Sequence, residues 1–485
     1  AEFELETCGG VTIWNNDAFV TDYIPFTRNM VKRTSIKIPL QKGENKLILC
    51  LDDLAERDTD YYFRLKYQGG QDLSIQLPVP EEVCTEQVYR YEKILDNICF
   101  EKETYISEPV ILSLPGHLLE QEQLKMSIAN GEWVEKMQHE KDEDPALSYE
   151  LKKDEKKLFL MDSKDILPGF YFFEFALQEG PVLLKRKLGN QIVWKEFLTN
   201  GSEDVRKRKE TVLDTIAKYS VPNSYKAAAY FEKGYHLEEA EQMLLDEIIG
   251  VNQRQDCSDF HFTTILTTYL KHQDEMSDKV KAVIKDAALN YRYWIDEPGD
   301  DVMWFFSENH ALLFHTCQYL AGRLFPEDVF TNSGKSGAEV SARGRKLLEE
   351  WFEEFFREFI TEWNSNAYIP VDVHGLAAIY NVTDKEDKLH EMAKKALDMV
   401  SYSLAVNAHK GAVMTSFGRT YEKEMKGNYN AGTTALLYLF YNEGFLARNG
   451  MGNVAVACGD YEAPSEYKKY ITLKEGQSLI FENTQ

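Results

Sequence analysis

The spacing of hydrophobic positions divides the chain into a β-rich part and a helical part, with the change near residue 200. The first part begins with short runs of β-branched and aromatic residues, which are separated by glycine-containing turns. These runs predict strands at 11–14, 34–40, 45–51 and 61–67. Short strands at this spacing favour a small β-sandwich over residues 1–80. Within it, we expect the charged stretch 52–58 to be a surface loop held by ion pairs.

A second β-rich region extends to about residue 200. Its apolar runs predict strands at 109–114, 123–128, 158–161 and 169–175. The dipeptide Asn130-Gly131 favours a tight turn, and the charged stretch 138–155 is expected to be an exposed excursion. We therefore predict a second β-rich domain over residues 81–200, in which residues 81–104 serve as a linker.

From residue 201 to about residue 450 the pattern is helical, and two kinds of helix alternate. The stretch 339–360 carries its large apolar residues at i, i+3 and i+4 spacing, with charged residues between them, and 386–406 is similar. By contrast, 311–322, 371–382 and 432–441 are apolar or small nearly all round, which is typical of helices buried on every side. Buried helices that alternate with exposed ones predict an (α/α) toroid with an inner and an outer ring. A short C-terminal β segment is expected at 451–485.

Polar and aromatic residues gather twice at the start of a predicted inner helix. The first group leads into the helix at 311–322 and consists of Trp304, Glu308, Asn309 and His310. The second leads into the helix at 371–382 and consists of Glu362, Trp363, Asn364, Asn366 and Tyr368. Since the ends of inner helices line the central cleft of a toroid, these side chains are candidates for contact with a substrate.

A third group lies in the connection before the helix at 432–441, where His409, Arg419 and Tyr421 stand near two glycines. Asp372 and His374 fall inside a predicted inner helix. Each residue also has a structural interpretation: Asn309 can cap a helix, the buried His and Asp residues can be partners in the core, and the tryptophans can pack. What favours a functional site is that polar residues from three separate helix connections are expected to meet at one end of the toroid.

The order of these motifs resembles that of the alginate and oligo-alginate lyases, which are (α/α)-toroid polysaccharide lyases of the heparinase-like superfamily. The resemblance covers residues 200–445. It rests on the Asn309-His310 pair, on Tyr368 some sixty residues later, and on the segment 367–379 that follows. Two features depart from that family: the β-rich regions precede the toroid here, and Glu308 and Glu362 add carboxylates that a lyase does not need.

The resemblance implies β-elimination of a glycosidic bond next to a uronic acid. In that reaction Asn309, helped by Arg419 or His310, neutralises the uronate carboxylate. Tyr368 and His310 are the candidates for base and acid. The predicted catalytic residues are Asn309, His310, Tyr368, Glu308 and Glu362. The predicted substrate-binding residues are Trp304, Trp363, Asn364, Asn366, His374, His409, Arg419 and Tyr421. No cofactor and no metal is expected.

Two alternatives remain open from the residues alone. A glycoside hydrolase on the same toroid would use two carboxylates among Glu308, Glu362 and Asp372. A non-catalytic carbohydrate-binding protein would instead use Trp304, Trp363 and Tyr368 as platforms for sugar rings. In all three cases the expected partner is a carbohydrate.

Composition narrows the class of partner. The 485 residues carry 80 acidic and 55 basic side chains, for a net charge of −25, so nucleic acid is an unfavourable partner. No run approaches the roughly 18–20 apolar residues of a membrane span. The seven cysteines form no CxxC pair, so neither a zinc site nor a disulfide framework is expected. We predict a cytoplasmic protein or a secreted bacterial enzyme, given as a piece of a longer chain without a signal peptide in this sequence.

Overall fold

The computed structural model describes residues 1–27, 29–53, 61–70, 72–76, 80, 82–131, 147–198, 200–301 and 303–480. The chain forms two compact units, Ala1–Glu81 and Glu82–Gln485. Much of the charged stretches 52–58 and 138–155 lies outside the described residues.

Two three-stranded antiparallel sheets build the first unit, in the orders β4-β1-β6 and β3-β2-β5. The strands are β1 (Glu2–Thr7), β2 (Gly10–Asn15), β3 (Ala18–Tyr23), β4 (Lys32–Lys37), β5 (Leu47–Asp52) and β6 (Phe63–Tyr67). Alternate side chains point to a shared core, in which Leu5 of one sheet and Ile13 of the other are fully buried. The N-terminal β-sheets expected from the sequence are therefore present.

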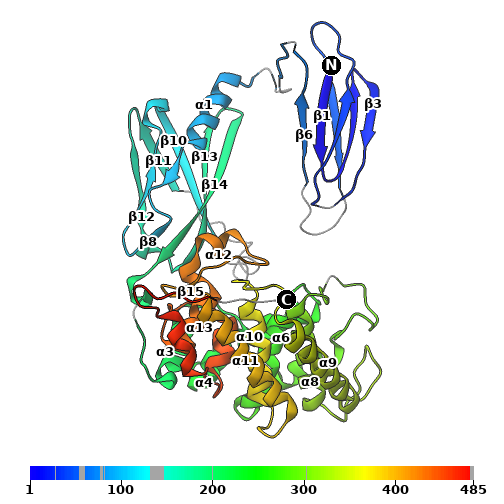
Figure 1. Cartoon of the computed structure of the whole chain (residues 1–485), viewed down its shortest axis with the longest axis vertical. Coiled ribbons are helices and arrows are strands. Elements are labelled where there is room, and N and C mark those ends of the chain that lie inside the picture. Colours follow the sequence, from blue (N-terminus) through cyan, green and yellow to red (C-terminus); the bar gives the residue numbers. More distant parts are fainter. Residues whose placement is uncertain are drawn as a thin grey trace. The chain divides into compact units, whose positions relative to one another are not determined.

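The N-terminal part of the second unit, up to about residue 198, is mainly β-structure (Figure 1). A five-stranded sheet has the order β11-β10-β13-β14-β8, and a three-stranded sheet has the order β12-β9-β7. The strands are β7 (Cys99–Phe100), β8 (Thr104–Ile106), β9 (Pro109–Ser113), β10 (Gln121–Asn130), β11 (Leu147–Lys152), β12 (Lys157–Asp162), β13 (Gly169–Glu179) and β14 (Val182–Val193). Buried residues of both sheets, such as Leu112 and Phe173, belong to one hydrophobic core.

Helix α1 (Thr85–Asp96) lies where the sequence suggested a linker. Its buried residues Tyr91, Ile94 and Leu95 recur at helical spacing and belong to the same core as the two sheets. The helix contacts β13 and β14. The part of the expected linker between residues 85 and 96 is therefore a packed helix.

Alternating helices follow, as predicted. The outer series comprises α3 (Val205–Tyr219), α5 (Leu237–Asn252), α7 (Asp278–Asn290), α9 (Gly337–Glu358) and α11 (Lys388–Val406). Of these, the sequence pattern identified α9 and α11. The inner series comprises α4 (Ser224–Lys233), α6 (Ser258–His272), α8 (Glu308–Leu324), α10 (Ile369–Val382) and α14 (Met451–Ala457). Each inner helix contacts the next, and α14 contacts both α10 and α4, so the inner ring closes. The helical part is an (α/α) toroid.

The C-terminal β segment predicted at 451–485 is wrong for the described residues 451–480. This stretch contains α14 and α15 (Lys468–Ile471) and no strand. A short apolar run such as 454–457 does not distinguish a buried strand from a buried helix. Packing decides here: a Cβ on Gly452 would lie 2.4 Å from the carbonyl oxygen of Pro370, so the glycine lets α14 lie directly against α10.

Helix α13 (Gly432–Tyr441) is buried nearly all round, as expected, but it contacts α3 and α11 of the outer series. Its side chains are also covered by the C-terminal segment, where the rings of Phe440 and Tyr461 have centroids 5.9 Å apart. The short α14 therefore takes the inner position that the sequence pattern gave to α13.

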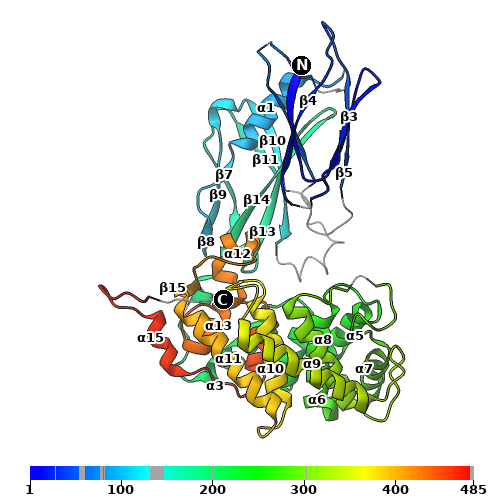
Figure 2. The same cartoon turned by 45° about the vertical axis from the view of Figure 1, so that its right-hand side comes forward.

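The connection between α11 and α13 is braced by the β-structure of the same unit. It contains β15 (Ala408–His409), β16 (Ala412–Val413) and α12 (Glu422–Lys426), and α12 contacts β14 (Figure 2). Asn430 Nδ2 donates a hydrogen bond to the Ile192 carbonyl at 3.3 Å. The β-sheet thus helps to hold a connection that carries candidate site residues. Among the described helices, none has both the length and the apolar character that crossing a membrane requires.

Candidate functional site

Hydrogen bonds join the start of α10 to the connection after α11. The Ser365 hydroxyl accepts the backbone N–H of Tyr368 at 3.1 Å and donates to the Arg419 carbonyl at 2.7 Å. The Gly418 N–H donates to the Trp363 carbonyl at 2.9 Å. Residues some fifty positions apart in the sequence are therefore held side by side at one end of the toroid.

The carboxylate of Glu362 is the centre of this end. Asn309 Nδ2, in the first turn of α8, donates to Glu362 Oε2 at 3.1 Å. Arg419 Nη1 donates to Glu362 Oε1 at 3.2 Å and forms an ion pair with it. The Asn309 side-chain oxygen accepts from the hydroxyl of Ser307, the N-cap of α8, at 3.1 Å. All three connections predicted from the sequence thus contribute to one polar cluster.

Two tyrosines lie against the same arginine. Arg419 Cζ lies 4.5 Å from the ring centroid of Tyr368 and 5.5 Å from that of Tyr421. The two phenolic oxygens are 2.5 Å apart. Burial and the hydrogen bond to Tyr421 raise the pKa of Tyr368 strongly, and the nearby Arg419 charge opposes this only in part. Tyr368 is therefore a protonated phenol at neutral pH.

Two further carboxyl groups interact electrostatically with Glu362. Burial raises the pKa of Glu308, although its Oε2 accepts hydrogen bonds from the Thr361 N–H at 2.9 Å and the Thr361 hydroxyl at 3.0 Å. Asp372, on α10, is 1% exposed, and its Oδ1 has no hydrogen-bond partner among the described residues. Burial first, and then the charges of Glu308 and Glu362, raise the pKa of Asp372 well above its usual value. The site therefore combines two carboxyl groups whose pKa is raised with a third, Glu362, that is paired to arginine.

His310 does not join this cluster, although it follows Asn309 directly. Successive helix residues point about 100° apart, so its ring turns toward α6. Its Nδ1 lies 2.9 Å from Asp259 Oδ2, and its Nε2 lies 3.8 Å from Cys257 Sγ. The ring stacks on Phe260 with centroids 4.9 Å apart.

The predicted substrate-binding residues divide into exposed and buried side chains. Trp304 and Trp363 are each 44% exposed, and Tyr421 is 39% exposed, so these rings are open to solvent. His409 is exposed on β15 and, within the described part of the chain, forms no hydrogen bond with the cluster. Asn364 is partly buried, has a φ of 54°, and accepts a hydrogen bond from Asn407 at 3.3 Å.

Two of these residues are buried in the interior. Asn366 accepts a hydrogen bond from the Thr433 hydroxyl at 3.0 Å and is 3% exposed. His374 is 2% exposed, with Nε2 3.3 Å from the Thr264 hydroxyl. Burial lowers the pKa of His374 to about 4, so its imidazole is neutral at pH 7. Asn366, which precedes α10, is thus bonded to α13, and His374 of α10 is bonded to α6.

Sequence reasoning missed the contribution of α6. Asp256, Cys257 and Asp259 surround the start of this inner helix, just as the recognised motifs surround α8 and α10. The available signal was the run Asp-Cys-Ser-Asp before a predominantly apolar stretch. Its partner, His310, lies 53 positions beyond Cys257, so the sequence spacing gave no sign of their contact.

Comparison with known proteins gives only distant likenesses. No family model and no curated protein matches the chain. A family 76 glycoside hydrolase from a bovine Bacteroides thetaiotaomicron strain has a TM-score of 0.25 at 8% identity, over 62% of this chain and 77% of that one. Escherichia coli alpha-2-macroglobulin, from domain MG7 to the C-terminus, has a TM-score of 0.24 at 10% identity, over 74% and 65%.

A β-glucuronidase from Parabacteroides merdae has a TM-score of 0.15 at 11% identity, and the match spans 41% of this chain and 26% of the enzyme. Likenesses at these scores do not assign a function to this chain.

Proposed function

We propose that this protein is a carbohydrate-active enzyme that cleaves a glycosidic bond with carboxyl groups at one end of the toroid. The observation that carries the proposal is the contrast between Glu308 and Glu362. Burial raises the pKa of Glu308, which favours its protonated form. Glu362 instead lies between the Arg419 guanidinium and the Asn309 amide. Neighbouring carboxyls in unlike environments are the usual means of assigning an acid and a base.

In this proposal Glu308 protonates the departing glycosidic oxygen, and Glu362 acts as the base or nucleophile on the other side of the sugar. Arg419 and Asn309 orient the Glu362 carboxylate. The exposed rings of Trp304 and Trp363 offer apolar faces for the C–H faces of sugar rings. The class of reaction is then glycoside hydrolysis.

Polysaccharide lyase activity is the second candidate, and a specific contact favours it. Asn309 and Arg419 together bind a carboxylate, which here belongs to Glu362. A uronate carboxylate that displaced Glu362 would receive the same two donors, which is the neutralisation that β-elimination needs. The displaced Glu362 carboxylate would take the proton from the carbon next to the uronate carboxyl, and Tyr368 would donate a proton to the leaving oxygen. The raised pKa of Tyr368 favours this acid role over a role as base.

Product chemistry separates the two candidates. Hydrolysis of neutral and uronate-containing glycans releases reducing ends alone, whereas elimination also gives a carbon–carbon double bond conjugated to a carboxylate, which absorbs ultraviolet light. For a hydrolase, Glu308→Gln should lower the rate by about 10²–10⁴-fold, and Tyr368→Phe should leave most activity. Glu391→Gln, at an exposed position of α11, is the matched control.

An ultraviolet-absorbing product that Tyr368→Phe abolishes would replace the hydrolase with the lyase. If Glu308→Gln retains full activity with either product, the acid role of Glu308 is wrong. Binding of glycans without turnover in any assay would indicate a carbohydrate-binding protein instead.

A further inference from the structure

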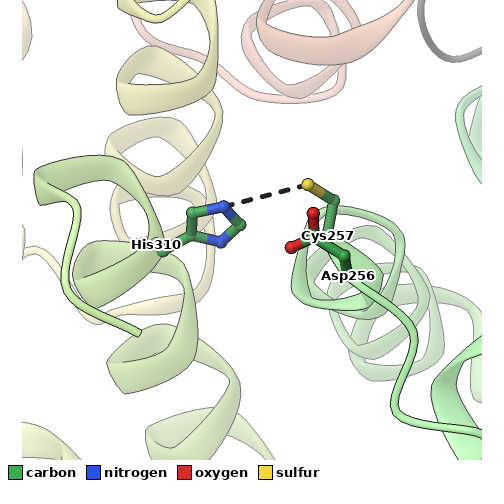
Figure 3. Close-up of side chains that lie close together, drawn as sticks. All are labelled: Asp256, Cys257 and His310. Atoms are coloured by element: carbon green, nitrogen blue, oxygen red, sulfur yellow. Dashed lines mark hydrogen bonds between the residues drawn. The ribbon is translucent and has the colours of Figure 1, made fainter. Parts of the chain in front are cut away.

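Three side chains with different donor atoms meet between α6 and α8. Asp256 and Cys257 immediately precede α6, and His310 lies in the first turn of α8. One oxygen, sulfur or nitrogen atom of each lies within 4.8 Å of those of the other two. The imidazole of His310 and the thiol of Cys257 face each other (Figure 3), with 3.8 Å between Nε2 and Sγ.

These separations suit a tetrahedral metal ion. Zinc binds nitrogen and oxygen at about 2.0–2.2 Å and sulfur at about 2.3 Å, which places neighbouring ligand atoms about 3.3–3.8 Å apart. The Cys257–His310 pair already has this spacing. The widest pair, at up to 4.8 Å, needs to close by about 1 Å, which a rotation of the half-buried Asp256 side chain can supply.

The histidine is oriented as a metal ligand requires. Its Nδ1 lies 2.9 Å from the carboxylate of Asp259, which is fully buried. When Nδ1–H donates to this carboxylate, the lone pair of Nε2 points toward Cys257. Zinc-bound histidines almost always have such a carboxylate or carbonyl behind them. The stacking of the ring on Phe260 further fixes its orientation.

We propose that Asp256, Cys257 and His310 bind one zinc-class divalent cation, with Asp259 as the residue that positions His310. The mixture of sulfur, nitrogen and oxygen donors favours Zn²⁺ or Co²⁺ over Mg²⁺ and Ca²⁺, which prefer oxygen alone. Three protein ligands leave a fourth position for water or another small ligand. The partial exposure of Asp256 provides an approach from solvent.

This site is distinct from the proposed carboxyl chemistry: His310 bonds to Asp259 and Cys257 of the α6 start, whereas Glu362 bonds to Asn309 and Arg419. It revises the expectation from the sequence that no zinc site exists. That expectation rested on the absence of CxxC pairs, whereas here two ligands are adjacent and the third comes from another helix.

Metal binding to the full chain, prepared without an affinity tag and stripped with a chelator, tests the proposal. Titration with Zn²⁺ alone, followed by calorimetry and elemental analysis, should give one ion per chain. Titration with Co²⁺ should give visible bands of a tetrahedral ion and a near-ultraviolet band of a cobalt–thiolate bond. Cys257→Ser should remove the thiolate band, and His310→Ala should remove tight binding.

Asp259→Asn should retain one ion but weaken its affinity by about 10–100-fold, as is usual when the partner of a metal-bound histidine is removed. Cys458→Ser is the matched control and should bind like the unaltered chain, because Cys458 lies at the opposite end of α6, where its carbonyl accepts a hydrogen bond from Lys271. Circular dichroism shows whether each variant folds. If one does not, the unaltered chain is tested instead: bound Zn²⁺ should protect Cys257 from thiol reagents.

Three outcomes would overturn the proposal: less than about 0.2 equivalents of bound Zn²⁺, Zn²⁺ binding that is unchanged in both Cys257→Ser and His310→Ala, or a Co²⁺ complex without a thiolate band. Rapid alkylation of Cys257 that depends on His310 and is insensitive to Zn²⁺ would identify a metal-free nucleophile instead. None of these results bears on glycan cleavage, so this proposal and the proposed function can fail separately.

Discussion

Arg419 and Glu362 form an ion pair across two connections of the toroid, with 3.2 Å between Nη1 and Oε1. The same guanidinium lies over the ring of Tyr368, and the same carboxylate accepts from Asn309. A single arginine therefore organises the charged end of the candidate site. Its side chain remains 34% exposed, so solvent still reaches it.

Arg419→Ala should lower activity much more than stability. A partly exposed ion pair contributes about 1 kcal/mol or less to the free energy of unfolding. The active site, however, loses both the cation and the group that orients the Glu362 carboxylate. On the best glycan, kcat/KM should therefore fall at least about tenfold, which corresponds to about 1.4 kcal/mol of activation free energy. Urea unfolding and initial rates measured on the same preparation compare the two effects. A loss of stability that accounts for the whole loss of activity would assign Arg419 a purely structural role.

Asp372 should make the stability of the protein depend on pH. Its pKa is raised in the folded state, so the folded chain holds the proton more tightly than the unfolded chain does. Stability is then lost as pH rises from the unfolded pKa through the folded pKa. A single group of this kind contributes at most about 1.4 kcal/mol per pH unit in that window.

Asp372→Asn should remove this dependence, because the amide keeps the size of the side chain and cannot ionise. Between pH 5 and pH 9, the free energy of unfolding should fall less steeply for the variant than for the unaltered chain. The stability of the variant relative to the unaltered chain should therefore increase as pH rises. Parallel curves for the two proteins would mean that Asp372 titrates alike in the folded and unfolded chains.

Gly452→Ala should destabilise the contact between α14 and α10. Its Cβ would lie 2.4 Å from the Pro370 carbonyl oxygen, which is backbone and cannot move aside freely. Overpacking of this kind costs about 1–3 kcal/mol, so thermal unfolding should begin several degrees lower. Gly250→Ala is the matched control: in α5 the nearest atom is the flexible end of Gln255, at 3.1 Å. That variant should be neutral or slightly stabilised, since alanine is the better helix former.

The sequence by itself determined the order of β-sheets and toroid and the identity of helices α8, α9, α10, α11 and α13. Hydrophobic spacing is a local property, so α9 and α11 follow from one-sided patterns, and α8 and α10 follow from apolar runs. It also singled out Asn309, Glu362 and Arg419, which hydrogen bonds bring together in the structure.

Only the tertiary structure decided which of these side chains contact one another. Asn309 and His310 are neighbours in sequence, yet the turn of the helix sends one to Glu362 and the other to Asp259. Likewise, the apolar run around Val454 is compatible with a strand or a helix. In the structure it is the helix α14, whose Gly452 packs against the Pro370 backbone. Cys257 meets His310 because α6 and α8 are consecutive inner helices that pack side by side, and no local pattern encodes which residues of the two helices then meet.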